Sequence, residues 1–87
     1  MTVSELERAS DELDAAAELA DGDASERLAT QADHLAELAE TGADHGRLAR
    51  HENTLRELEA DAGDDVAARI DAAMDSITAY RETIEGV

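Results

Sequence analysis

Apolar residues recur every three or four positions along almost the whole chain, which is the spacing of one face of an α-helix. Four such stripes are present, and breaks that contain glycine separate them. The pattern predicts four helices, over residues 3–20, 24–41, 45–62 and 65–85, within one helical domain, 1–87. Good helix formers are common, proline is absent, and no segment alternates as a strand does. The sequence therefore predicts an all-α fold.

The breaks between the predicted helices are short, which favours neighbouring helices that run antiparallel. We therefore expect an antiparallel up-down four-helix bundle of short helices. Two helix starts have the spacing of a capping box: Thr2 with Glu5, and Asp23 with Glu26. A glycine marks each predicted helix end. The break at 42–46 fits two readings, a full turn between helices or a bend within one helix.

The predicted core is thin, since the stripes hold few side chains larger than alanine. Small domains lie near marginal stability for this reason. Alanine faces allow helices to approach closely, but an uncovered apolar edge can also be buried against a second copy. We therefore expect a homodimer in which the second copy completes the bundle.

The charge of the chain changes the picture of its surroundings. It has 23 acidic residues against 7 basic ones, a net charge of −16, and all of the basic residues are arginine. Such self-repulsion destabilises a compact state unless salt screens it, and in molar salt the Debye length is only about 3 Å. Lysine stems would also expose methylene groups where salt strengthens apolar association. The composition is typical of a halophilic protein with loosely associated cations and hydration water at its carboxylate surface. The alternative, an acidic disordered chain, does not explain the helical spacing.

The chain contains no cysteine, which excludes disulfides, thiolate metal sites and a cysteine nucleophile. Its N-terminus lacks the basic start and apolar run of a signal peptide, and no apolar stretch approaches the ~18 residues of a membrane span. We expect a soluble, cytoplasmic protein that does not bind membranes.

Carboxylate-rich bundles can bind two metal ions, but they do so through Glu-x-x-His on two helices. No histidine here follows a glutamate at that spacing, because the residues there are Gln31, Gly42 and Leu48. No glycine-rich phosphate loop is present, and no serine lies near a histidine in the sequence. We therefore expect no catalytic residue, metal site or cofactor, and predict that the protein is not an enzyme.

The basic residues are unevenly distributed. Arg47, Arg50, His51 and Arg56 lie within ten residues, where only Glu52 opposes them. This cluster is a candidate patch for docking an acidic partner helix, a nucleic acid or an anionic ligand. The alternative is that these arginines pair with carboxylates of adjacent helices, which are abundant here.

His51 also lies on the apolar stripe of its helix, between Leu48 and Leu55. This position favours a hydrogen-bonded histidine in the core or at an interface, and Tyr80 or an acid of the last helix is its expected partner.

These features predict a non-enzymatic module for self-association or protein docking. The alternative is an accessory, transcription-related nucleic-acid-binding protein that uses the arginine-rich third helix. The strong acidity opposes it, since phosphate contacts need a basic footprint, and one tyrosine is the only aromatic residue for base stacking.

The segments 51–58, 63–66 and 80–87 resemble a group of short, acidic, uncharacterised proteins from haloarchaea. The resemblance covers about residues 45–87, and more loosely the whole chain. It implies a haloarchaeal source and a domain of unknown function, and it implies no activity, ligand or catalytic residue.

Overall fold

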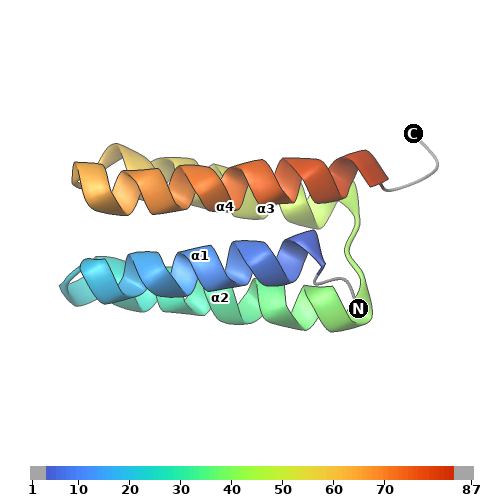
Figure 1. Ribbon diagram of the computed structural model, residues 1–87, viewed down its shortest axis with the longest axis horizontal. Coiled ribbons are helices and arrows are strands. Elements are labelled where there is room, and N and C mark those ends of the chain that lie inside the picture. The colour runs from blue at the N-terminus through green and yellow to red at the C-terminus, as the bar shows by residue number, and fades with distance from the viewer. Residues whose placement is uncertain (1–3, 84–87) are drawn as a thin grey trace.

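The computed structural model describes residues 4–83, which fold into four α-helices (Figure 1). They are α1 (Glu5–Leu19), α2 (Gly22–Thr41), α3 (His45–Ala60) and α4 (Asp64–Thr83). Successive helices run antiparallel in an up-down bundle, and no strand occurs in residues 4–83. The predicted all-α bundle is therefore confirmed, and the predicted helix ends differ by a few residues.

The helices form two layers, one of α1 and α2 and the other of α3 and α4 (Figure 1). The connection after α2 crosses from one layer to the other, and the whole measures 38 × 26 × 17 Å. Helix α1 packs closely against both α2 and α4, and α3 packs mainly against α4. The backbones of α2 and α3 approach each other least among the adjacent helices, so the α2–α3 seam is the most open side of the bundle.

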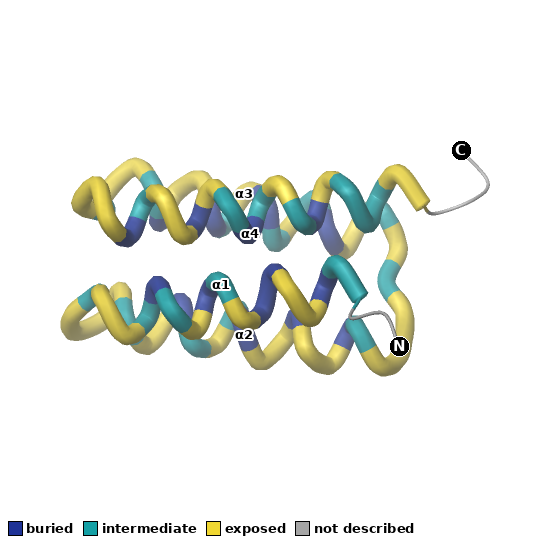
Figure 2. Tube along the Cα trace, in the orientation of Figure 1, coloured by how far each residue is buried: buried dark blue, intermediate teal, exposed yellow. Residues whose placement is uncertain are grey.

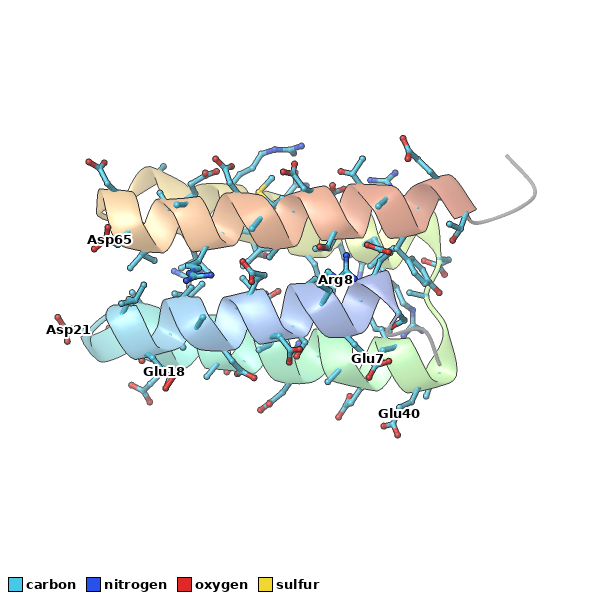
Figure 3. The ribbon with its side chains drawn as sticks, in the orientation of Figure 1. Glu7, Arg8, Glu18, Asp21, Glu40 and Asp65 are labelled. Atoms are coloured by element: carbon cyan, nitrogen blue, oxygen red, sulfur yellow. The ribbon has the colours of Figure 1, made fainter. Side chains whose placement is uncertain are left out.

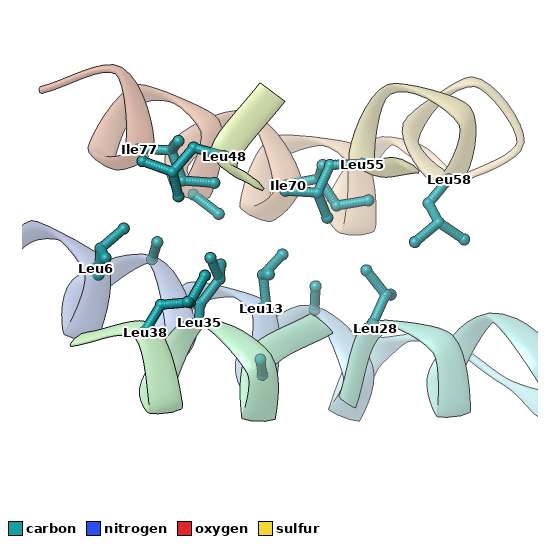
Figure 4. Packing of buried hydrophobic residues seen from close by; sticks show 14 of the residues in the cluster. Leu6, Leu13, Leu28, Leu35, Leu38, Leu48, Leu55, Leu58, Ile70 and Ile77 are labelled. Atoms are coloured by element: carbon teal, nitrogen blue, oxygen red, sulfur yellow. The ribbon is translucent and has the colours of Figure 1, made fainter. Parts of the chain in front are cut away.

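The core lies between the layers, where leucine and isoleucine side chains from all four helices meet (Figure 4). Figure 2 shows buried residues on the inner sides of the helices. The side chains that solvent does not reach occur at the helical spacing that the sequence predicts, and the largest are Leu6, Leu13, Leu28, Leu35, Leu48, Leu55, Ile70 and Ile77.

Small residues let α1 and α2 pack closely. Ala32 is fully buried, and the buried hydroxyl of Ser10 donates a hydrogen bond of 2.8 Å to its carbonyl oxygen. Near the turn of this hairpin, the Ser25 hydroxyl donates to the Ala17 carbonyl oxygen at 2.7 Å. A buried hydroxyl is costly without a partner, so these bonds make serine acceptable inside the hairpin.

The first helix is capped two residues later than the sequence analysis predicted. Ser4 Oγ accepts from the Glu7 amide at 3.1 Å, and Glu7 Oε1 accepts from the Ser4 amide at 3.3 Å, which is a capping box. Ser4 and Glu7 have the same spacing as Thr2 and Glu5, and Ser4 directly precedes the first helical turn. The predicted Thr2 cap is therefore wrong, and Thr2 itself lies outside the described residues.

The other helix boundaries also correct the predicted caps. Helix α2 begins at Gly22, so Asp23 lies in its first turn and Asp21 occupies the cap position without a side-chain hydrogen bond. Gly22 has a φ of +58°, and this left-handed conformation allows the short reversal after α1. That reversal follows Ala20 rather than a glycine cap.

The break at 42–44 is a full turn between helices. Gly42 ends α2 with a φ of +88°, and Asp44 Oδ1 accepts from the Arg47 amide at 2.8 Å to cap α3. Gly46 therefore lies inside α3. Helix α3 ends at Ala60 instead of residue 62, and the predicted end of α4 at residue 85 lies outside the described residues.

Candidate functional site

An open polar groove of about 840 Å³ lies between α2 and α3, beside the turn that joins them. Helix α2 contributes one wall and α3 the other. The polar residues that line this α2–α3 groove are Gln31, His34 and Glu37 from α2, Asp44 from the turn, and Arg47, Arg50, His51 and Thr54 from α3. The groove occurs where these two helices approach each other least.

Three of the four predicted patch residues line this groove: Arg47, Arg50 and His51. Arg56 does not line it. Arg56 follows Arg50 by six residues, which places it about 120° further round the helix. It is exposed there, and its guanidinium donates to Asn53 Oδ1 at 3.3 Å. The predicted patch is therefore divided, and its first three members form the candidate site.

The arginines of the predicted patch are not used for ion pairing within residues 4–83. There, neither Arg47, Arg50 nor Arg56 has a carboxylate oxygen within 4.0 Å, so internal pairing does not account for the cluster. Asp44 is close in sequence, but its carboxylate caps α3 through the Arg47 amide. Both Arg47 and Arg50 are exposed at the groove.

His51 joins the two walls of the groove. Its Nδ1 lies 2.5 Å from Gln31 Oε1, and its ring meets the ring of His34 edge-on, with centroids 5.8 Å apart. The predicted contact with Tyr80 or an acid of α4 is wrong, because this edge of the α3 stripe faces α2. Since Gln31 Oε1 can only accept, the contact requires a proton on His51 Nδ1.

Burial lowers the pKa of His51 from its ordinary value of 6.5, and the nearby His34 lowers it further. Burial disfavours the charged imidazolium, and a second positive ring adds repulsion. At neutral pH His51 is therefore uncharged, and the charged residues of the groove are Arg47 and Arg50 together with Glu37 and Asp44.

This pKa can be tested directly. An NMR titration of the imidazole protons is expected to give His51 a pKa below 6.5. The unfolded chain then binds the proton more readily, so the contribution of His51 to stability is present above pH 6.5 and is lost as the pH falls through the folded pKa. The loss should stay below about 1 kcal/mol, because His51 is half-exposed. A His34→Gln variant should raise the His51 pKa partway, and a pKa at or above 6.5 would contradict the buried geometry.

A second polar cluster joins α3 to α4 near the same end of the bundle. The Arg81 guanidinium forms an ion pair with Glu52, and its Nε donates to His45 Nδ1 at 3.1 Å. The Glu52 side chain is only 8% exposed. This pair was not predicted, although the sequence contains a signal for it. Glu52 lies four residues after Leu48 and three before Leu55, on the buried stripe, where an acid needs a cation.

Carboxylates crowd one another elsewhere on the surface. Burial raises the pKa of the Asp14 carboxyl, and the negative charge of Asp33 on the neighbouring helix contributes to the rise. A hydrogen bond with Asp71, with smaller effects of burial and charge, raises the pKa of the Glu59 carboxyl. Figure 3 shows further carboxylates, such as Glu18 and Glu40, pointing away from the bundle. The acidic charge is thus carried on the outside, where salt can screen it.

Residues 4–83 contain neither a metal-binding cluster of side chains nor a helix that could span a membrane. No group of three or more histidine and acidic side chains there is arranged to hold a metal ion. None of the helices in residues 4–83 is both long and apolar enough to cross a bilayer.

Fold and groove together define a small acidic four-helix bundle with a polar, arginine-lined groove along one seam. The chain belongs to a family of unknown function (DUF7553), whose model matches residues 1–83. The implied domain of unknown function is thereby confirmed, and the match includes α1 and α2 as well as the C-terminal half. No curated protein and no solved structure matches the chain.

Proposed function

We propose that this protein is a non-enzymatic docking module that binds an acidic segment of a partner protein in the α2–α3 groove. The observation that carries the proposal is the position of Arg47 and Arg50. Both are exposed at the groove, and neither has a carboxylate within 4.0 Å among residues 4–83, in a chain of net charge −16. Carboxylates outnumber arginines about threefold, so guanidinium groups left unpaired at a groove favour a carboxylate from outside.

Arginine suits such a role in concentrated salt. A guanidinium can bind a carboxylate through two parallel hydrogen bonds, and this short-range contact depends less on long-range attraction than a lysine point charge does. We also infer a halophilic setting, a salt-rich cytoplasm of the haloarchaeal kind, because the lysine-free acidic composition suits it. In that solvent, salt screens the long-range attraction between charges, so direct contact is the main source of affinity.

The test compares two charge reversals in the full chain. The double variant Arg47→Glu/Arg50→Glu is expected to weaken partner capture from a native extract in molar KCl by at least about tenfold, since two charge-assisted contacts become repulsive. The matched control is Arg56→Glu, on the same helix but outside the groove, which should leave capture unchanged. Circular dichroism in the same salt checks that both variants remain helical. Equal loss in both variants would contradict the groove as the site.

The same preparations separate the alternatives. Self-association, including the expected homodimer, is measured as the mass by light scattering in molar KCl. Nucleic-acid binding is measured by DNA retention across salt concentrations, because a phosphate binder must lose affinity steeply as salt rises. DNA retention that disappears with Arg47→Glu/Arg50→Glu would replace the protein-docking proposal.

A further inference from the structure

The α2–α3 groove does not end at His51. It continues along the seam through a shallower hollow of about 240 Å³ that Gln31 and Thr54 also line. Arg27 links that hollow to a third one of about 650 Å³, next to the turns that follow α1 and α3. Each hollow shares a lining residue with the next, so the three follow one another along α2, and we call them together the seam track. Between Ala24 and Leu38 of α2 it extends about 21 Å, the length of a helix of about 14 residues.

Among the buried core hydrophobics, the small exposed fraction that remains lies along this track. Twelve of the fifteen buried core hydrophobics have 0% exposure. The other three, Leu38, Leu58 and Val66, retain 7–9%, and all three line the seam track. The exposed Leu19, the one large hydrophobic residue exposed within residues 4–83, lies beside the hollow near the turns.

The chemistry of the seam track changes from one end to the other. At the end next to the α2–α3 turn it is polar, and Arg47 and Arg50 share it with two carboxylates, Glu37 and Asp44. Towards the other turns it is apolar at its base, with Leu58 and Val66, and carboxylates surround it: Asp21, Asp23, Asp61, Asp64 and Asp65. An occupant must therefore place its own acids at the arginine end and keep them away from the other end, where they would be repelled.

The arginines have divided roles that match this track. Arg27, Arg47 and Arg50 line it, whereas Arg69 and Arg81 form the ion pairs within residues 4–83. Of the five arginines that form no ion pair within residues 4–83, three thus line the seam track, whereas Arg8 and Arg56 lie elsewhere. Arg47 and Arg50, which form no ion pair within residues 4–83, and the exposed Leu19 point to the same kind of occupant.

We propose that the partner segment is an amphipathic helix that lies along the seam track as a fifth helix. Its acids face Arg47 and Arg50, and its apolar side chains cover Leu58 and Val66 near Leu19. A second copy of this chain is a poorer fit, because each described helix already buries its apolar stripe within its own bundle. This inference rests on the proposed function and adds that the partner segment is an amphipathic helix.

The experiment uses synthetic alanine-based helical peptides of about 14 residues as probes, titrated into the full chain in molar KCl and followed by NMR. The first probe has glutamates in one terminal turn and leucines towards the other end. A second has lysines in place of the glutamates, and a third has alanines in place of the leucines. The first probe is expected to bind and to shift amide signals of α2 and α3. Arg47→Glu/Arg50→Glu should weaken its binding at least tenfold, and Arg56→Glu should not.

The outcomes distinguish the two proposals. If the probe without leucines binds as well as the first, and binding still needs the two arginines, the docking function stands and the fifth helix is wrong. If the lysine probe binds equally well, if the shifts map to another face, or if no probe binds at millimolar concentration, the fifth helix is also overturned. A dimer in light scattering that excludes the first probe would assign the track to a second copy. A loss of capture that is equal for the groove and control variants would instead contradict the docking site itself.

Discussion

Replacing Leu35 by alanine is expected to lower the free energy of unfolding by about 3 kcal/mol. Leu35 has no exposed surface and lies in the core between the layers, where the labelled leucines and isoleucines meet (Figure 4). The change removes buried apolar surface and leaves a cavity that rigid helices fill only in part. A domain of this length typically has about 5–10 kcal/mol in total, so the variant would lose a large share of its stability.

The matched control is Leu19→Ala, since Leu19 is the same residue type but is 51% exposed. It is expected to change the free energy of unfolding by less than about 1 kcal/mol, because little apolar surface leaves the core. Urea unfolding of both variants in the same concentration of KCl measures the difference. If both variants lost the same free energy of unfolding, Leu35 would be no more buried than Leu19, and the described core would be wrong.

Replacing Arg81 by methionine is the second change expected to have a large effect, again about 3 kcal/mol. The cost comes less from the lost attraction than from the Glu52 carboxylate, which stays 8% exposed without its cation. The contact with His45 Nδ1 would be lost as well. Because the pair is largely buried, salt screens it weakly, and the loss should persist in molar KCl.

A double-mutant cycle tests this reason for the loss. Glu52→Leu extends the stripe of α3 between Leu48 and Leu55, so the double variant Glu52→Leu/Arg81→Met should recover most of the stability lost in Arg81→Met. The control is Arg69→Met, which breaks the exposed pair with Glu12 at 3.5 Å and should cost less than about 1 kcal/mol. If the double variant is less stable than either single variant, the pair stabilises the bundle by more than offsetting the cost of burying its two charges.

Periodicity along the chain was sufficient to predict the helices and the apolar residues they bury, but not the buried Ser10 and Glu52. Leu6 and Leu13, or Ile70 and Ile77, follow a spacing that depends only on the geometry of one helix, so no knowledge of the neighbours was needed. The helix caps were less predictable, because Thr2 with Glu5 and Ser4 with Glu7 have the same spacing. Only the exact start of α1 selected the second pair.

The site was predictable in part. The concentration of arginines on the third predicted helix identified Arg47, Arg50 and His51. The separation of Arg56 from them follows from its angular position on the same helix, which the clustering in sequence does not reveal. The groove itself could not be predicted, since it depends on how far α2 and α3 stand apart.

The sequence by itself determined the helices, their apolar faces, the acidic surface and the unusual cluster of arginines, because these depend on composition and on short-range order. The tertiary structure decided which arginines form ion pairs and which remain at the groove. Arg81 reaches Glu52 across 29 residues of sequence, and His51 meets Gln31 across 20. Such contacts depend on the rotation and separation of whole helices, which the pattern along any one of them does not specify.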